Sequence, residues 1–166
     1  MININKVEKI NAPIEEIFRY IENPENLKLY FPNIVDIINS YISEKKVGDS
    51  FVATFITMGA VFEELFTVNE YEDLNSISLS FEGVLNGKMG FNFHKIYKDV
   101  TLANFYLNYR INNDISENPI DSIIFQRLST INFERVLENL KLVSETSYIL
   151  SNSKIYIFRK LTQAYI

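Results

Sequence analysis

The chain has 166 residues, the length of one domain, and its 47% hydrophobic and 22% charged residues exclude an intrinsically disordered protein. It has no cysteine and one histidine, which excludes disulfides, thiolate metal sites, thiol nucleophiles and any metal site that needs two imidazoles. The net charge of −5 argues against nucleic-acid binding, which normally requires a basic surface.

Positive charge is concentrated at the C-terminal end. Residues 148–166 contain Lys154, Arg159 and Lys160 and no acidic residue, so this segment carries +3 and the remainder −8. Such a segment is expected to pack on its own acidic domain, to touch an anionic membrane, or to dock on a protein partner. The N-terminus lacks the apolar run of a signal peptide and no stretch reaches the length of a membrane span. We therefore expect a cytoplasmic protein, in which residues 151–166 would make any peripheral membrane contact.

The N-terminal region predicts one strand and two short helices. Residues 2–10 show the alternation of a strand. Pro13 then begins an amphipathic helix over residues 14–21, since proline is tolerated at the first helical position. A second short helix over residues 24–31 ends before Pro32, which cannot continue it.

From residue 34 to residue 112 the hydrophobic period changes to two. Short turn signals separate the apolar runs, so successive strands are expected to pair antiparallel. The six predicted strands lie near residues 34–43, 50–58, 61–71, 75–85, 88–97 and 100–112.

The parity of the apolar positions constrains two of the hairpins. Three neighbouring strands are apolar at odd-numbered positions, and a two-residue turn at Asn86-Gly87 would pair odd with even positions. Because directly paired residues share a face of the sheet, we predict a bulge near Gly83 or Gly90, or a turn of odd length. By the same rule the next turn is predicted to hold three residues, 98–100.

After Pro119 the period returns to 3.6 and predicts one helix to about residue 146, about 40 Å long. The curved sheet is the expected partner for its apolar stripe, and residues 153–161 favour an added strand. The chain is thus predicted to be an α+β domain over residues 1–147 with a C-terminal extension over residues 148–166. The predicted stripe contains Ile120, Ile124, Leu128, Ile131, Phe133, Val136, Leu137, Leu140 and Val143.

Four short segments resemble motifs of one known superfamily. They are residues 10–18 (INAPIEEIF), 23–34 (NPENLKLYFPNI), 47–51 (VGDSF) and 137–141 (LENLK). Together with the order of elements, they resemble the helix-grip SRPBCC superfamily of START, polyketide cyclase and coenzyme Q-binding proteins. The likeness covers residues 2–146. It implies a curved antiparallel sheet of about seven strands, wrapped around the long C-terminal helix, with two short helices after the first strand.

A long helix on a curved sheet often leaves an apolar cavity with a few placed polar groups, and the resemblance favours one here. The alternative is that the aromatic side chains fill this space completely. The residues expected to line the cavity are Leu27, Tyr30, Phe31, Phe91, Phe93, Phe105, Leu107, Tyr109, Ile124 and Leu128.

Two adjacent carboxylates, Glu63 and Glu64, are the candidates for chemistry. Consecutive strand residues face opposite sides, so one of them must face the interior, where burial would raise its pKa. That carboxylate would serve as a general acid/base or as a polar anchor for a ligand, unless it lies at the open rim. His94 and Arg110 are expected on the outer face, and no phosphate loop or metal-ligand cluster is present, so we expect no cofactor.

These features favour a binding or transport protein for a hydrophobic small molecule, which the resemblance extends to a lipid, isoprenoid, quinone or aromatic polyketide-like ligand. One alternative is a cyclase/dehydratase-type enzyme that uses Glu63 or Glu64. Another is an accessory protein, similar to the carbon monoxide dehydrogenase G-like relatives, that docks through residues 151–166. Either a monomer or a homodimer is compatible with the sequence.

Overall fold

The computed structural model describes residues 1–38, 46–57, 59–112 and 119–163, with the backbone alone described for 119–122 and 154–163. Its elements show the predicted helix-grip order, in which one strand, short helices and six strands precede the C-terminal helices. They are β1 (Ile2–Ile10), α1 (Ile14–Ile21), η1 (Pro24–Asn26), α2 (Leu27–Tyr30), β2 (Ile34–Ile38), β3 (Ser50–Thr57), β4 (Ala60–Glu72), β5 (Ser76–Gly83), β6 (Leu85–Tyr97), β7 (Val100–Ile111), α3 (Pro119–Glu134) and α4 (Val136–Gln163).

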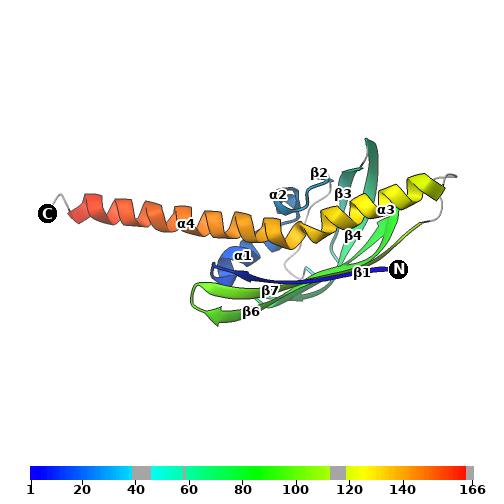
Figure 1. Ribbon diagram of the computed structural model, residues 1–166. Coiled ribbons are helices and arrows are strands. Elements are labelled where there is room, and N and C mark those ends of the chain that lie inside the picture. Colours follow the sequence, from blue (N-terminus) through cyan, green and yellow to red (C-terminus); the bar gives the residue numbers. More distant parts are fainter. Residues whose placement is uncertain (39–45, 58, 113–118, 164–166) are drawn as a thin grey trace.

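The seven strands form one antiparallel sheet in the order β1-β7-β6-β5-β4-β3-β2. Figure 1 shows the sheet on one side, with α3 and the first part of α4 lying across it. From β2 to β7, strands that follow one another in the chain lie side by side in the sheet. β1 is the exception, because it pairs with β7, the last strand of the chain. The predicted fold class is confirmed. The predicted strand residues 39–43 lie outside the described residues.

The β5–β6 hairpin has the odd-length connection that parity requires. Phe81 pairs with Gly87 and Leu79 with Met89, so five residues separate the last pair and apolar positions meet apolar positions. The turn lies around Val84, before the predicted Asn86-Gly87 position, and the pairing shows no register shift.

The β6–β7 hairpin also pairs apolar positions with apolar positions, but through a different feature of the backbone. The predicted three-residue turn over 98–100 is wrong, because Tyr97 pairs directly with Val100 across a two-residue turn. A register shift between Lys95 and Tyr97 restores the match of odd positions, as a β-bulge does. Both devices keep one face of the sheet apolar.

The predicted single C-terminal helix is two helices, α3 and α4, separated at Arg135. The Arg135 amide donates to the Asn132 carbonyl at 3.2 Å, a contact three residues back that marks the end of regular α-helix. The chain changes direction at this break (Figure 1), so α3 and α4 follow the sheet as two straight pieces. α3 contacts β3 and β1, and α4 contacts β1, β7, α1 and α2.

α4 continues well beyond the domain. The predicted strand over residues 153–161 is wrong, because the backbone stays helical to Gln163 and extends past α1 away from the sheet (Figure 1). Since α4 crosses residue 147 without interruption, the division of the chain there stays a prediction. In the described residues no helix is both long enough and apolar enough to span a membrane.

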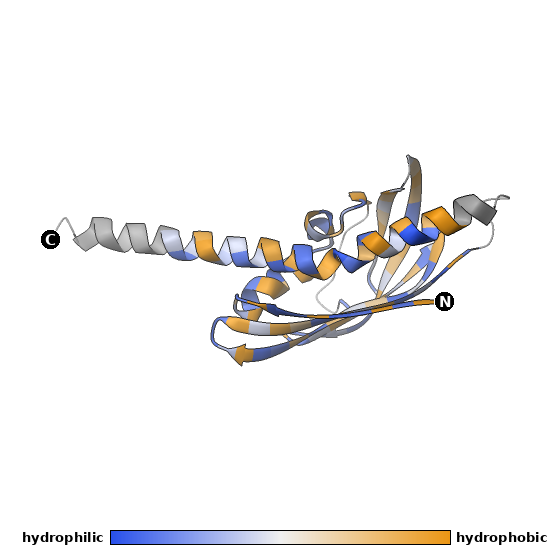
Figure 2. Ribbon diagram, viewed as in Figure 1, coloured by the Kyte–Doolittle hydropathy of each residue, from blue (hydrophilic) through white to orange (hydrophobic). Residues whose placement is uncertain are grey.

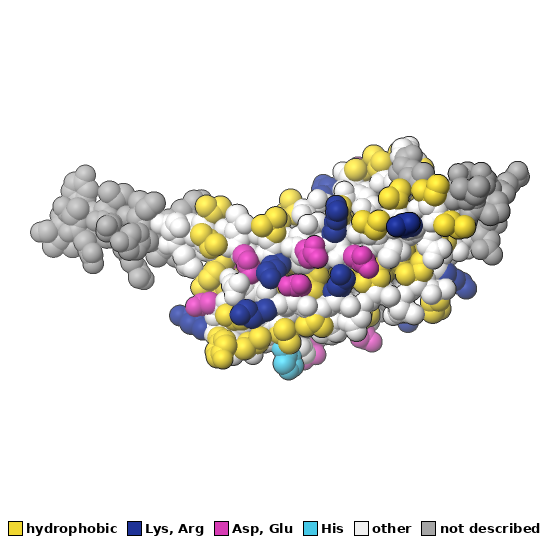
Figure 3. Space-filling view, viewed as in Figure 1, with side chains coloured by type: hydrophobic (Ala, Val, Ile, Leu, Met, Phe, Trp, Pro, Cys, Tyr) yellow, Lys and Arg dark blue, Asp and Glu magenta, His cyan; other side chains and the backbone are white. Residues whose placement is uncertain are grey.

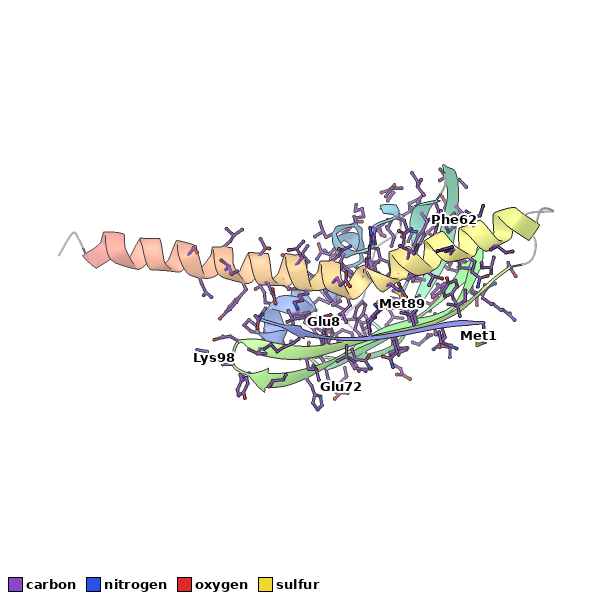
Figure 4. All side chains as sticks on the ribbon, in the orientation of Figure 1. Met1, Glu8, Phe62, Glu72, Met89 and Lys98 are labelled. Carbon is purple, nitrogen blue, oxygen red and sulfur yellow. The ribbon has the colours of Figure 1, made fainter. Side chains whose placement is uncertain are left out.

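Aromatic rings fill the space between the sheet and the helices. In Figure 4 side chains occupy the layer beneath α3 and α4, where Phe62 and Met89 are labelled. Phe91 is the centre of this layer: its ring lies 4.9 Å from Phe105, 6.1 Å from Phe93 and 6.2 Å from Tyr30, between ring centroids. These contacts connect α2 to the middle strands of the sheet.

Candidate functional site

Glu64 is the carboxylate that the sheet directs into the interior. It lies between Phe62 and Phe66 on the helix-facing side of β4, and its exposed fraction is 0%. Its neighbour Glu63 is exposed on the other face, as the alternation of a strand requires. The structure therefore distinguishes the two predicted candidates, and it does not place the inward one at an open rim.

The two carboxylate oxygens of Glu64 differ in their contacts. The Leu85 amide donates a hydrogen bond to Oε1 at 2.7 Å, whereas Oε2 has no partner among the described residues. Burial raises the pKa of Glu64 to about 7, and the backbone amides of Leu85 and Val84 partly oppose the shift. Glu64 is thus a buried acid that titrates near neutral pH and has one unused oxygen.

Gly83 provides the space that the Glu64 carboxylate occupies. The two residues are paired across β4 and β5, and a Cβ atom at position 83 would lie 2.5 Å from Glu64 Oε2. It would also lie 2.6 Å from the Glu63 carbonyl oxygen, which cannot move without the strand. A side chain at this position would therefore displace the acid.

α3 lies across the interior from β4, near Glu64. The Phe125 ring packs edge-on against Phe62 at 5.5 Å between centroids, which connects α3 to β4 two residues from Glu64. One helical turn further, Ser129 is buried, and its hydroxyl has no hydrogen-bond partner in the described part of the chain. Glu64 on the sheet and Ser129 on α3 therefore each have a buried polar atom without a partner among the described residues.

Tyr109, on β7, connects α3 to a second strand of the sheet. Its hydroxyl lies 2.9 Å from Thr130 Oγ1, and its ring lies 5.3 Å from the Phe133 ring. Burial raises the pKa of Tyr109, while the contact with Thr130 opposes the shift, so the phenol stays protonated at neutral pH. This hydroxyl contributes one of the polar contacts between α3 and the sheet.

Eight of the ten predicted lining residues lie in the interior, and two do not. Ile124 and Leu128 are 40% and 37% exposed on the outer face of α3, so the prediction that they face the sheet is wrong. Phe125 and Ser129 face the sheet in their place. The buried residues are Leu27, Tyr30, Phe31, Phe91, Phe93, Phe105, Leu107 and Tyr109.

A spacing signal for the correct face of α3 was present in the sequence. Phe125, Ser129 and Phe133 recur every four residues and continue in phase to Val136 and Leu140, all buried. The predicted stripe contained both Ile131 and Phe133, which are only two residues apart. Side chains at that spacing point in directions more than half a turn apart around the helix, so they cannot lie on one face. The serine at position 129 concealed the correct pattern.

The described residues beneath α1 and α2 leave little empty volume. An enclosed cavity of about 20 Å³ lies beneath α1 and α2, which is room for about one water molecule. Tyr30 and Phe91 are in its wall, and burial raises the pKa of the Tyr30 phenol. In this conformation the aromatic rings fill that part of the interior. The other residues of the cavity wall are Ile21, Glu22, Pro24, Leu27, Phe51, Val68, Ile77, Leu79 and Met89.

The remaining polar candidates lie on the outside. His94 and Arg110 are exposed on the outer face of the sheet, as predicted. The described residues contain no group of three or more histidine, aspartate or glutamate side chains arranged to hold a metal ion.

Comparison with known proteins identifies relatives by fold. No protein-family profile matches the sequence, and no curated protein matches it. A START superfamily protein from Mycobacterium smegmatis is 14% identical over 87% of this chain and 97% of its own length, with a TM-score of 0.69. A protein from Thermus thermophilus is 20% identical over 88% of this chain and 99% of its own, with a TM-score of 0.67. The Zhui aromatase/cyclase from a Streptomyces species is 10% identical over 87% of this chain and 93% of its own, with a TM-score of 0.66.

At these identities the likeness shows the fold. The chain has the helix-grip architecture that START-like and aromatase/cyclase proteins share, and each match covers most of both chains. The predicted likeness to the carbon monoxide dehydrogenase G-like relatives stays a prediction.

Proposed function

We propose that the protein binds a mainly apolar small molecule that carries a hydroxyl group, and that Glu64 holds this hydroxyl. The observation that carries the proposal is the Glu64 Oε2 atom, which is buried without a partner in the described structure. An unpaired buried polar group costs about 1–3 kcal/mol. A ligand hydroxyl in contact with Oε2 would recover that free energy.

The surroundings of Glu64 favour an apolar ligand body. Phe62 and Phe66 flank it on β4, Phe81 packs against Phe66 at 5.4 Å, and Phe125 covers Phe62 from α3. Apolar surface buried against such rings contributes about 25 cal/mol per Å² to binding. Affinity would come from this contact, and orientation from the single carboxyl group.

The pKa of about 7 favours a group that can both donate and accept a hydrogen bond, as a hydroxyl does. Near neutral pH both protonation states of Glu64 are populated. A hydroxyl donates to the ionised form and accepts from the protonated form, whereas a ketone pairs with the protonated form alone and an ammonium group with the ionised form alone. A hydroxylated ligand therefore satisfies Oε2 across the physiological range.

Because Glu64 is 0% exposed, a ligand that contacts its Oε2 atom must displace part of the protein. α3 is the element suited to move, since the break at Arg135 separates it from α4. Its described inner face buries Phe125, Ser129 and Phe133, while apolar side chains also cover its outer face. Figure 2 shows hydrophobic residues around α3, and Figure 3 shows them gathered on the surface at this end of the molecule.

A catalytic role for Glu64 is a second candidate, supported by its pKa near neutral pH. A general acid/base works best when its pKa lies near the working pH. The Zhui protein is named an aromatase/cyclase, and that activity is its own. For a cyclase/dehydratase reaction here, Glu64 would replace Glu63 as the candidate, because Glu63 is exposed on the outer face.

Native mass spectrometry of the full chain after incubation with a cell lipid extract tests the proposal. We expect one retained small molecule per chain, lost in Glu64→Leu and kept in the matched control Glu63→Leu. An extract that leaves the wild-type chain unliganded, or a ligand that Glu64→Leu retains equally, would contradict the proposal.

A further inference from the structure

α4 carries an exposed apolar stripe where it leaves the domain. Leu142, Ile149 and Leu150 are 65%, 61% and 56% exposed. We define these three residues as the α4 stripe. Spacing of seven residues continues the pattern from Ile149 to Tyr156 and from Leu150 to Ile157 in the sequence.

A packed partner would stabilise the end of α4. Residues 154–163 (KIYIFRKLTQ) are half apolar, and their backbone helix extends past α1 beyond the sheet (Figure 1). In proteins most of the stability of a helix comes from packing of its apolar face. A second helix laid along α4 would supply that packing.

The domain also offers a groove beside the stripe. It has a volume of about 460 Å³ and lies where α1 and α2 meet α4, with Tyr20, Leu29 and Leu142 among its lining residues. A helix that followed the α4 stripe toward the domain would reach this groove.

We infer that the partner is a second copy of this chain, with the two α4 helices antiparallel about a two-fold axis near Ile149. In that register Leu142 comes to the level of Tyr156 of the partner subunit, and the stripes face each other. Glu138 comes to the level of Lys160 of the partner subunit. The first half of each α4, with Glu138, Lys141 and Glu145 and a net charge of −1, thus lies along the basic last part of the other.

Charge favours this occupant over an anionic membrane. The C-terminal segment carries +3 and the rest of the chain −8, so two antiparallel copies can each place the basic segment beside the acidic part of the other, whereas an anionic membrane attracts the segment and repels the rest. A second copy instead offers carboxylates. Glu145 accepts hydrogen bonds from Asn11, and Asp99 accepts one from Tyr148. The described hydrogen-bond partners of these two carboxylates are therefore neutral groups. Both line a groove on the other flank of α4.

The absence of native cysteine allows a direct test on the full chain. Ile149→Cys places one thiol near the proposed two-fold axis, and mild oxidation should link two chains in high yield. The matched control is Ile123→Cys, at 64% exposure on α3, which should stay unlinked. Equal linking of the two variants, or none at position 149, would overturn the inference.

Sedimentation velocity gives the second readout. We expect the wild-type chain to sediment as a dimer, at twice its mass of 19.4 kDa. The double substitution Ile149→Glu with Leu150→Glu should sediment as a monomer of 19.4 kDa. The control substitution Val61→Glu, on the outer face of the sheet, should leave the protein dimeric. Circular dichroism verifies that each variant is folded. A monomeric wild-type chain, including one that co-sediments with phosphatidylserine vesicles, would overturn the inference, as would a dimer that survives the double substitution.

Discussion

Gly83 faces Glu64 across β4 and β5 so closely that a Cβ atom at position 83 would lie 2.5 Å from Oε2 of the carboxylate. This contact joins a glycine near a turn to the one fully buried carboxylate of the described residues. It means that the position of the acid depends on the neighbouring strand as well as on its own.

Gly83→Ala should therefore destabilise the protein by about 1–3 kcal/mol, the usual cost of overpacking. Denaturant unfolding measures this loss. In a Glu64→Ala background the side-chain part of the clash disappears, while the contact with the Glu63 carbonyl remains. The penalty should then be smaller, and an equal penalty in both backgrounds would contradict the contact.

Stability should fall as pH rises through the titration of Glu64. Its folded pKa of about 7 lies above the ordinary value of 4.5, so the folded chain binds the extra proton between these values. The stabilisation is present below about pH 4.5 and is lost by about pH 7, with a size of at most about 3 kcal/mol. Chemical unfolding across this range should show the slope in the wild type. Glu64→Gln should flatten it and Glu63→Gln should not, and an unchanged slope in Glu64→Gln would exclude the raised pKa.

The inward face of α3 can be tested by one pair of truncations. Phe125→Ala removes a buried ring that packs on Phe62 and should cost about 3 kcal/mol or more. Leu128→Ala, on the outer face, should cost less than about 1 kcal/mol. The reverse order of the two free energies of unfolding would mean that Leu128 faces the sheet after all.

Amide hydrogen exchange should distinguish α3 from the start of α4. Residues 123–134 of α3 bury two apolar side chains, Phe125 and Phe133, whereas residues 136–144 bury Val136, Leu137 and Leu140 with 0–1% exposure. Segments with little buried apolar surface open at lower free energy. Amides of α3 should exchange faster than those of residues 136–144, and equal protection would remove the argument that α3 admits a ligand.

The alternation of residues predicted the sheet correctly because each strand has one apolar face, and the parity of Phe81 and Phe91 required either a bulge or a turn of odd length. Sequence reasoning could not choose between the devices that restore register. The β5–β6 hairpin uses a five-residue connection, and the β6–β7 hairpin uses a bulge before Tyr97. Turn geometry and bulges satisfy the same constraint at similar cost, so local sequence does not select one.

The candidate site was predictable in part. The strand pattern showed that Glu63 or Glu64 must face inward, but the register across β4 and β5 decides that Glu64 is buried against Gly83. Ser129 was missed because an apolar stripe was sought and a serine interrupts it. The helical extension was missed because β-branched and aromatic residues near Ile157 favour a strand locally.

Calorimetric titration with 2-naphthol and naphthalene tests the central claim most directly, because the two probes differ by one hydroxyl. A hydrogen bond to Glu64 should make 2-naphthol bind about tenfold or more tightly than naphthalene. Glu64→Leu should abolish that difference, while Glu64→Gln, which retains a carbonyl acceptor, and the outer-face control Glu63→Leu should keep it. Equal affinity of the two probes for the wild-type chain, or a hydroxyl preference that survives Glu64→Leu, would contradict the account.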